Sequence, residues 1–125
     1  MEGYSVLLVD DEEEFVSALS ERLMLRGIEV EIALDGREAL ARFAEKPADV
    51  IILDVMMPGL GGLEILKRIK KSSPHIQVIL LTGHGATKEG IEGMRLGAFD
   101  YLIKPVDIEE LLEKMKEAVK TTGTG

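Results

Sequence analysis

The feature of this sequence that most constrains its fold is a regular alternation of short apolar runs with segments of helical periodicity. Two runs, 50–53 (VIIL) and 76–81 (IQVILL), are almost continuously apolar, as expected of strands covered on both faces. A third run, 28–33 (IEVEIA), alternates apolar and polar residues and is typical of a half-exposed edge strand. The runs 5–9 and 99–103 complete the set of predicted strands.

Each apolar run is followed by a segment in which apolar residues recur every three to four positions, as in an amphipathic helix. The first of these segments carries apolar residues at this spacing: Phe15, Ala18, Leu19 and Leu23. The fourth contains Gly90 and Gly93 in its interior. Each interior glycine costs about 1 kcal/mol relative to alanine, so we expect the least stable helix there.

Alternating strands and helices predict an α/β domain with a parallel sheet covered by helices on both faces. Right-handed crossovers leave few topologies for such a sheet. We predict one doubly wound sheet of five strands in the order 2-1-3-4-5, with five helices. The predicted domain covers residues 1–120, and the polar residues 121–125 are expected to form a flexible tail.

Composition excludes several classes of protein. The 125 residues include no cysteine, so neither a disulfide framework nor a thiolate metal site is available. A net charge of −8 disfavours contact with phosphate backbones, and we expect no direct binding of nucleic acid. The chain has no signal-peptide pattern and no apolar run near the roughly 20 residues of a membrane helix, so a cytoplasmic location without membrane contact is expected.

Polar residues follow four of the five predicted strands at the point where each strand ends. Asp10 and Asp11 follow the first, Asp54 the third, Thr82 the fourth and Lys104 the fifth. In a doubly wound sheet, the functional site lies beyond the carboxyl ends of the strands, near the switch in strand order. The predicted topology therefore gathers three carboxylates, a hydroxyl and an ammonium at one edge.

These groups suit phosphoryl transfer assisted by a divalent cation. Two carboxylates about 5 Å apart repel by about 3 kcal/mol at an effective dielectric constant of about 20, which a hard cation would relieve. Oxygen donors without cysteine favour Mg²⁺. In this interpretation Asp54 is the nucleophile, Asp10 and Asp11 hold the metal, and Lys104 and the Thr82 hydroxyl bind phosphoryl oxygens.

Each residue also has a purely structural interpretation. Asp11 could cap the first helix with Glu14 as its partner, Asp54 could initiate a turn, Thr82 could end a strand and Lys104 could face solvent. Their coincidence at the same end of neighbouring strands favours the functional interpretation.

Four motifs, LLVDDEE, IILDVMMPG, LLTGHG and GAFDYLIKP, occur in this order between residues 4 and 120. With these motifs the chain resembles the receiver domain of bacterial two-component response regulators, which has a flavodoxin-like fold. The resemblance implies that Asp54 accepts a phosphoryl group from a histidine kinase or phosphotransfer protein. It also implies that Asp10, Asp11, Asp54 and the backbone carbonyl of Met56 bind Mg²⁺.

The resemblance further implies that Thr82 and Tyr101 form a switch pair, that Lys104 contacts the phosphoryl group, and that the peptide bond to Pro105 is cis. The face made by the fourth helix, fifth strand and fifth helix would signal to an output domain or downstream protein, and a phosphorylation-dependent homodimer is compatible with it. Three positions set this chain apart from many relatives or vary within the family: Gly61, Met56 and His84.

The leading hypothesis is a phosphorylation-controlled switch that turns over no external metabolite. A magnesium-dependent phosphohydrolase is an alternative, although the adjacent Asp10 and Asp11 differ from the D-x-D pair of such enzymes. A flavin or nucleotide binder would need a glycine-rich first loop, where this chain has DDEEE. A receiver-like scaffold that is never phosphorylated is disfavoured by the intact acids, Thr82 and Lys104.

Overall fold

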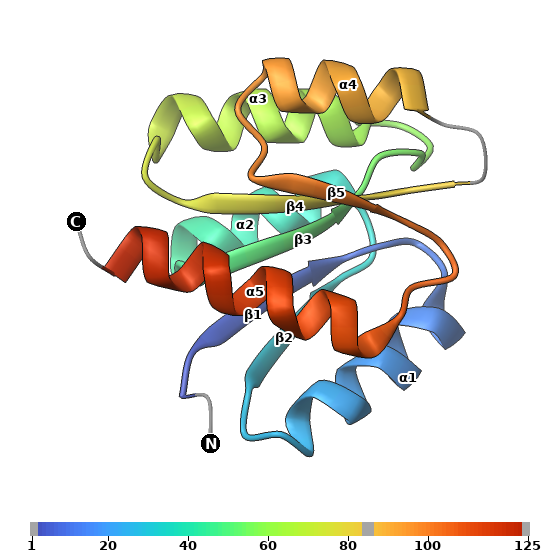
Figure 1. The fold of residues 1–125 in the computed structure, drawn as a ribbon. Coiled ribbons are helices and arrows are strands. Elements are labelled where there is room, and N and C mark those ends of the chain that lie inside the picture. Colours follow the sequence, from blue (N-terminus) through green and yellow to red (C-terminus); the bar gives the residue numbers. More distant parts are fainter. Residues whose placement is uncertain (1–2, 84–86, 124–125) are drawn as a thin grey trace.

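The computed structural model describes residues 3–83 and 87–123 of the chain. Strands and helices alternate strictly along the sequence, as predicted (Figure 1). The elements are β1 Ser5–Val9, α1 Glu13–Met24, β2 Glu29–Ala33, α2 Gly36–Glu45, β3 Val50–Asp54, α3 Gly62–Ser72, β4 Gln77–Thr82, α4 Thr87–Arg95, β5 Asp100–Ile103 and α5 Ile108–Gly123.

The five strands form one parallel sheet in the order β2-β1-β3-β4-β5, which confirms the predicted topology. The register places the last residues of neighbouring strands close to one level: Val9 pairs with Leu53, and Thr82 with Ile103. The order switches direction after β1, which lies between β2 and β3. The carboxyl ends of β1, β3, β4 and β5 are thereby brought to a common edge.

Two apolar layers cover the sheet, and the alternation of side chains along β3 explains both. Ile51 and Leu53 point into the layer that includes residues of α2 and α3, whereas Val50 and Ile52 point into the layer formed with α1 and α5. Figure 1 shows α1 and α5 together on one face of the sheet, with α2, α3 and α4 on the other. Because every residue of β3 is buried, this strand carries Asp54 on a rigid support.

The half-exposed edge strand predicted at 28–33 is β2, which lies at the edge of the sheet and is largely half-buried. The predicted apolar stripe of α1 was wrong at Ala18, which is exposed. The buried face of α1 instead contains Val16, Leu19, Ser20 and Leu23. Val16 continues the three- to four-residue spacing of Leu19 and Leu23, and this rotates Ala18 toward solvent.

The C-terminal helix is longer than the sequence suggests. α5 extends to Gly123, so residues 121–123, which were expected to belong to a flexible tail, are helical. Residues 124–125 of the expected tail lie outside the described residues. Among the residues that the structure covers, no helix combines the length and the apolar character needed to cross a bilayer.

Two glycines allow helices to approach the sheet closely. A Cβ atom on Gly62, at the start of α3, would lie 2.5 Å from the backbone oxygen of Asp54. A Cβ atom on Gly93 of α4 would overlap the Cδ1 atom of Leu80 in β4. The interior glycine of α4 is therefore required by packing, whatever its effect on helix propensity.

Replacing a leucine by alanine should reduce the free energy of unfolding far more in the core than on the surface. Leu66 is fully buried in α3, so Leu66→Ala is expected to reduce the free energy of unfolding by about 2–5 kcal/mol. Leu25 is 85% exposed, and Leu25→Ala should change it by no more than about 0.5 kcal/mol. Urea unfolding of both variants checks this, and equal costs would contradict the observed packing.

Candidate functional site

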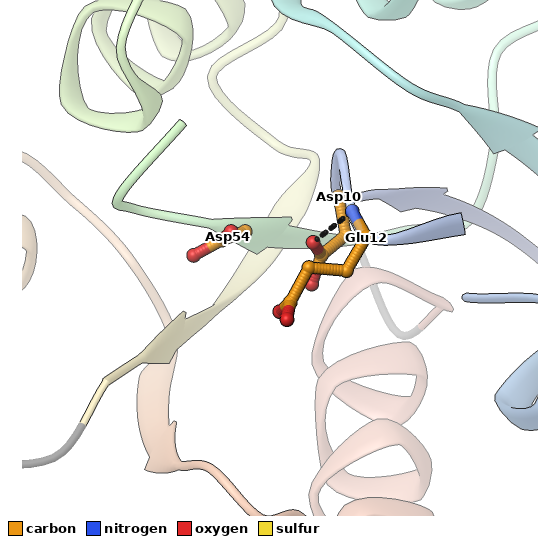
Figure 2. A group of neighbouring side chains, drawn as sticks. All are labelled: Asp10, Glu12 and Asp54. Atoms are coloured by element: carbon orange, nitrogen blue, oxygen red, sulfur yellow. Dashed lines mark hydrogen bonds between the residues drawn. The ribbon is translucent and has the colours of Figure 1, made fainter. Parts of the chain in front are cut away.

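Three carboxylates from two strand ends converge at the carboxyl edge of the sheet. Asp10 follows β1 directly, Glu12 lies two residues further on, and Asp54 ends β3 (Figure 2). One carboxylate oxygen from each residue lies within 4.8 Å of the other two. Asp10 is 0% exposed and Asp54 4% exposed, so two of the three charges are withdrawn from water.

The backbone fixes one oxygen of each buried aspartate. Asp10 Oδ1 accepts a hydrogen bond from the backbone N–H of Glu12 at 3.0 Å. Asp54 Oδ1 accepts one from the N–H of Met56, also at 3.0 Å. An aspartate bonded to the N–H two residues on forms a local turn, which holds the side chain in one orientation. The second oxygen of each aspartate, Oδ2, lies near the ammonium of Lys104.

The ammonium of Lys104 lies among these carboxylates. Its Nζ atom is 2.7 Å from Asp10 Oδ2, 2.6 Å from Glu12 Oε1 and 3.6 Å from Asp54 Oδ2. The same nitrogen lies 4.7 Å from the centre of the Phe15 ring, within the range of a cation–π contact. Lys104 thus connects the end of β5 to the ends of β1 and β3.

Lys104 and Asp10 each change the pKa of the other. Burial alone would lower the pKa of the Lys104 ammonium, but its contacts with Asp10 and Glu12 and the charge of Asp54 outweigh burial and raise it. Burial also raises the pKa of Asp10, an effect that the contact with Lys104 and the N–H of Glu12 oppose. The ammonium therefore remains charged at neutral pH.

The residues present fit a hard divalent cation. One ammonium faces three carboxylates, which leaves excess negative charge in a partly buried space. Asp10 Oδ2 is buried, and the Lys104 ammonium lies 2.7 Å from it. Among the described residues the group consists of carboxylates alone, and carboxylate oxygens are the donors that Mg²⁺ prefers.

The structure brings Glu12, rather than Asp11, into the acidic group. Asp11 is exposed and is not one of the three converging carboxylates. Asp11 does not cap α1 either, because the N-cap position is Glu12, which makes no side-chain capping bond. The Glu12 backbone is extended there, with φ −84° and ψ 94°, and its side chain reaches Lys104 instead. A ligand role for Asp11 stays a prediction.

The remaining predicted site residues lie along β4 and β5. Thr82 is fully buried, and its Oγ1 donates a hydrogen bond to the backbone oxygen of Leu102 at 3.4 Å. Tyr101 is half-buried on the neighbouring strand β5, where its register partner is Leu80. The peptide bond between Lys104 and Pro105 is cis, as expected.

Three further positions that the sequence singled out are Met56, His84 and Gly61. The Met56 side chain is 60% exposed, and its backbone N–H holds Asp54. His84, a position that varies within the family, lies outside the described residues. Gly61 occupies the N-cap position of α3 with extended backbone and no side-chain bond, so this departure from many relatives still permits the turn.

Sequence reasoning missed three residues of the site: Glu12, Phe15 and Gly62. Glu12 was part of an acidic run, and only the extended backbone at the start of α1 directs it inward. Phe15 was assigned to the helical stripe but also lies beneath the ammonium. The close approach of Gly62 to Asp54 has no sequence signal beyond the glycine itself.

The fold and the site together define a class of protein: a doubly wound domain with buried carboxylates, a hydroxyl and an ammonium at the switch in strand order. The profile of the response regulator receiver domain matches residues 6–116. The chain belongs to this family, whose general function is phosphoacceptor signal transduction.

Individual relatives agree with this assignment. The chain is 40% identical over 124 residues to an uncharacterised transcriptional regulatory protein, YkoG, of Bacillus subtilis, covering 99% of this chain and 54% of YkoG. It is 38% identical over 117 residues to the response regulator MprA of Mycolicibacterium vanbaalenii, covering 94% of this chain and 51% of MprA. The chain therefore spans about half the length of these curated relatives.

Solved structures support the same conclusion. A response regulator receiver domain protein from Clostridium thermocellum superposes with a TM-score of 0.93 at 38% identity, covering 97% of this chain and 98% of that one. The receiver domain of NtrX from Brucella abortus gives a TM-score of 0.89 at 31% identity, covering 93% and 98%.

Removing the carboxylate of Glu12 should lower the pKa of the Lys104 ammonium. Glu12→Gln removes one contact that raises this pKa, and because Glu12 is exposed we expect only a small fall. Glu13→Gln, at the exposed neighbouring position, is the matched control. An NMR titration of the Lys104 side chain measures both, and equal pKa values in the two variants would contradict the contact.

The same shift has a consequence for stability. The pKa of Lys104 is higher in the folded protein than its ordinary value of 10.5, so its contribution to stability is complete below that pH and is lost as pH rises through the folded value. Relative to Glu12→Gln, the unaltered protein should therefore lose more stability above about pH 10.5.

Proposed function

We propose that this domain accepts a phosphoryl group on Asp54 from a partner histidine kinase or phosphotransfer protein. The observation that carries the proposal is the geometry of Asp54 itself. One oxygen is fixed by the Met56 N–H, and the other faces the Lys104 ammonium at 3.6 Å. A carboxylate held in this way can attack phosphorus, and the ammonium can bind an oxygen of the transferring group.

In the proposed step, a carboxylate oxygen of Asp54 forms a bond to phosphorus while the bond between phosphorus and the donor imidazole nitrogen breaks. The imidazole departs with the electron pair of that bond and takes up a proton. In this step Lys104 would give up part of its contact with Asp10 and Glu12. Its ammonium would then neutralise negative charge on the oxygens of the phosphoryl group. The Thr82 hydroxyl, buried at the end of β4, is the proposed hydrogen-bond donor to a further oxygen.

We assign Asp10, Asp11, Asp54 and the backbone carbonyl of Met56 to a Mg²⁺ ion. The converging carboxylates, two of them buried, support the assignment for Asp10 and Asp54. When bound, the ion would neutralise negative charge on the phosphoryl oxygens. Glu12 lies in the same acidic group. In this proposal Lys104 keeps its ion pair with Glu12 while the aspartates bind the cation.

The output of this switch would pass through the face made by α4, β5 and α5. Thr82 and Tyr101 are the proposed switch pair, and three large apolar side chains are exposed on α4 and β5: Ile91, Met94 and Ile103. Such residues suit contact with an output domain, a downstream protein or a second copy of the chain after phosphorylation. The domain would regulate a partner and turn over no external metabolite.

Incubation with Mg²⁺ and acetyl phosphate should add the mass of one phosphoryl group to the intact protein. Asp54→Asn should abolish the gain because the amide cannot act as the nucleophile. Intact-mass spectrometry measures both results.

Asp49→Asn is the matched control, because Asp49 precedes the same strand and is exposed at its other end. This variant should still gain one phosphoryl group. Equal incorporation in Asp54→Asn and the unaltered protein would exclude Asp54 as the acceptor.

A further inference from the structure

Two buried glycines of α4, Gly90 and Gly93, lie directly against side chains of β5 and β4. Leu80 of β4 and Tyr101 of β5 are register partners in the sheet. A Cβ atom on Gly93 would overlap Leu80, and a Cβ atom on Gly90 would meet the Tyr101 ring. Both glycines are buried and lie three positions apart on one face of the helix. Each glycine thus leaves room for one of the paired side chains.

The contact at Gly90 is made by the ring itself. The added Cβ would lie 2.9 Å from Cδ2, 3.0 Å from Cε2 and 3.0 Å from Cγ of Tyr101. These distances are shorter than carbon–carbon contacts of about 3.5–4.0 Å, so the ring or the helix would have to move. A rigid ring that meets the new atom along one edge cannot avoid it by a small change at its tip.

Tyr101 is also linked to the edge of the sheet that carries Asp54, through β4 and through the backbone of Leu102. Leu80 and Thr82 lie on the same face of β4 because side chains alternate along a strand, and Tyr101 packs against that face. The Thr82 hydroxyl donates to the backbone of Leu102, the residue next to Tyr101. The ring therefore lies against α4, on the face of the sheet to which Leu80 and Thr82 belong.

We propose that Gly90 is a positioning residue that determines where the Tyr101 ring lies, because its missing side chain leaves the space on α4 that the ring occupies. Any side chain at this position displaces the ring from α4. The signalling role of Tyr101 rests on the proposed function, but the position of its ring does not. The interior glycine, which weakens the helix by its propensity, is explained by this contact.

The direct test places fluorine on both tyrosines, Tyr4 and Tyr101, by incorporation of 3-fluorotyrosine. Tyr101→Phe assigns the two ¹⁹F resonances. In Gly90→Ala the Tyr101 resonance is expected to shift and to show a larger solvent isotope effect, while the buried Tyr4 remains unchanged. An unshifted Tyr101 resonance in Gly90→Ala would overturn the proposal.

Gly61→Ala is the control, because a Cβ atom there would meet nothing within 4 Å and φ is −71°. Both resonances should keep their positions in this variant. A shift of Tyr101 in Gly61→Ala as large as in Gly90→Ala would also overturn the proposal, since the effect would then not depend on contact with the ring.

A double-mutant cycle tests the same contact through stability. Alanine is favoured over glycine inside a helix, so Gly90→Ala should raise the urea midpoint when Tyr101 is also replaced by alanine. With Tyr101 present, the gain should be smaller or reversed. The same effect of Gly90→Ala in both backgrounds would contradict the proposal.

Phosphorylation separates this inference from the proposed function. Gly90→Ala should still gain one phosphoryl group on Asp54, but the accompanying change in the Tyr101 resonance should be reduced. If the unaltered protein gains no phosphoryl group, the proposed function fails, and the ring displacement in the unphosphorylated protein still decides the role of Gly90.

Discussion

The contact of one ammonium with three carboxylates organises the functional edge of this domain. Lys104 reaches Asp10 and Glu12 at 2.7 and 2.6 Å and faces Asp54 at 3.6 Å, and it thereby joins the ends of β5, β1 and β3. Two buried aspartates beside each other would repel without this partner. The lysine makes the arrangement stable while leaving excess negative charge, and that excess is what a divalent cation and a transferring phosphoryl group can use.

The topology and most of the edge could be predicted from the sequence. Asp10, Asp54, Thr82 and Lys104 were found because each follows a strand, and the parallel order fixes where strand ends meet. Glu12 could not be found in this way, because its direction depends on the extended backbone before α1. The boundary of α5 was also missed, since polar residues at a helix end carry little signal for where it stops.

The glycines of α4 show a second limit of sequence reasoning. The pattern indicates a weak helix, and it cannot distinguish a helix that tolerates glycine from one that needs it. The structure decides this, because Leu80 and Tyr101 occupy the space where the Cβ atoms would be. The glycines lower the helix propensity of α4 but allow it to pack closely against β4 and β5. This packing places α4 against the strand that ends at Thr82 and the strand that ends just before Lys104.

A magnesium titration followed by NMR of the carboxyl carbons and of the Lys104 side chain tests the shared site most directly. The account predicts that the resonances of Asp10, Asp54 and Lys104 move together and saturate with one dissociation constant, because the cation and the ammonium neutralise the same carboxylates. Saturable changes confined to acidic residues elsewhere in the chain, or none at these three residues, would contradict it.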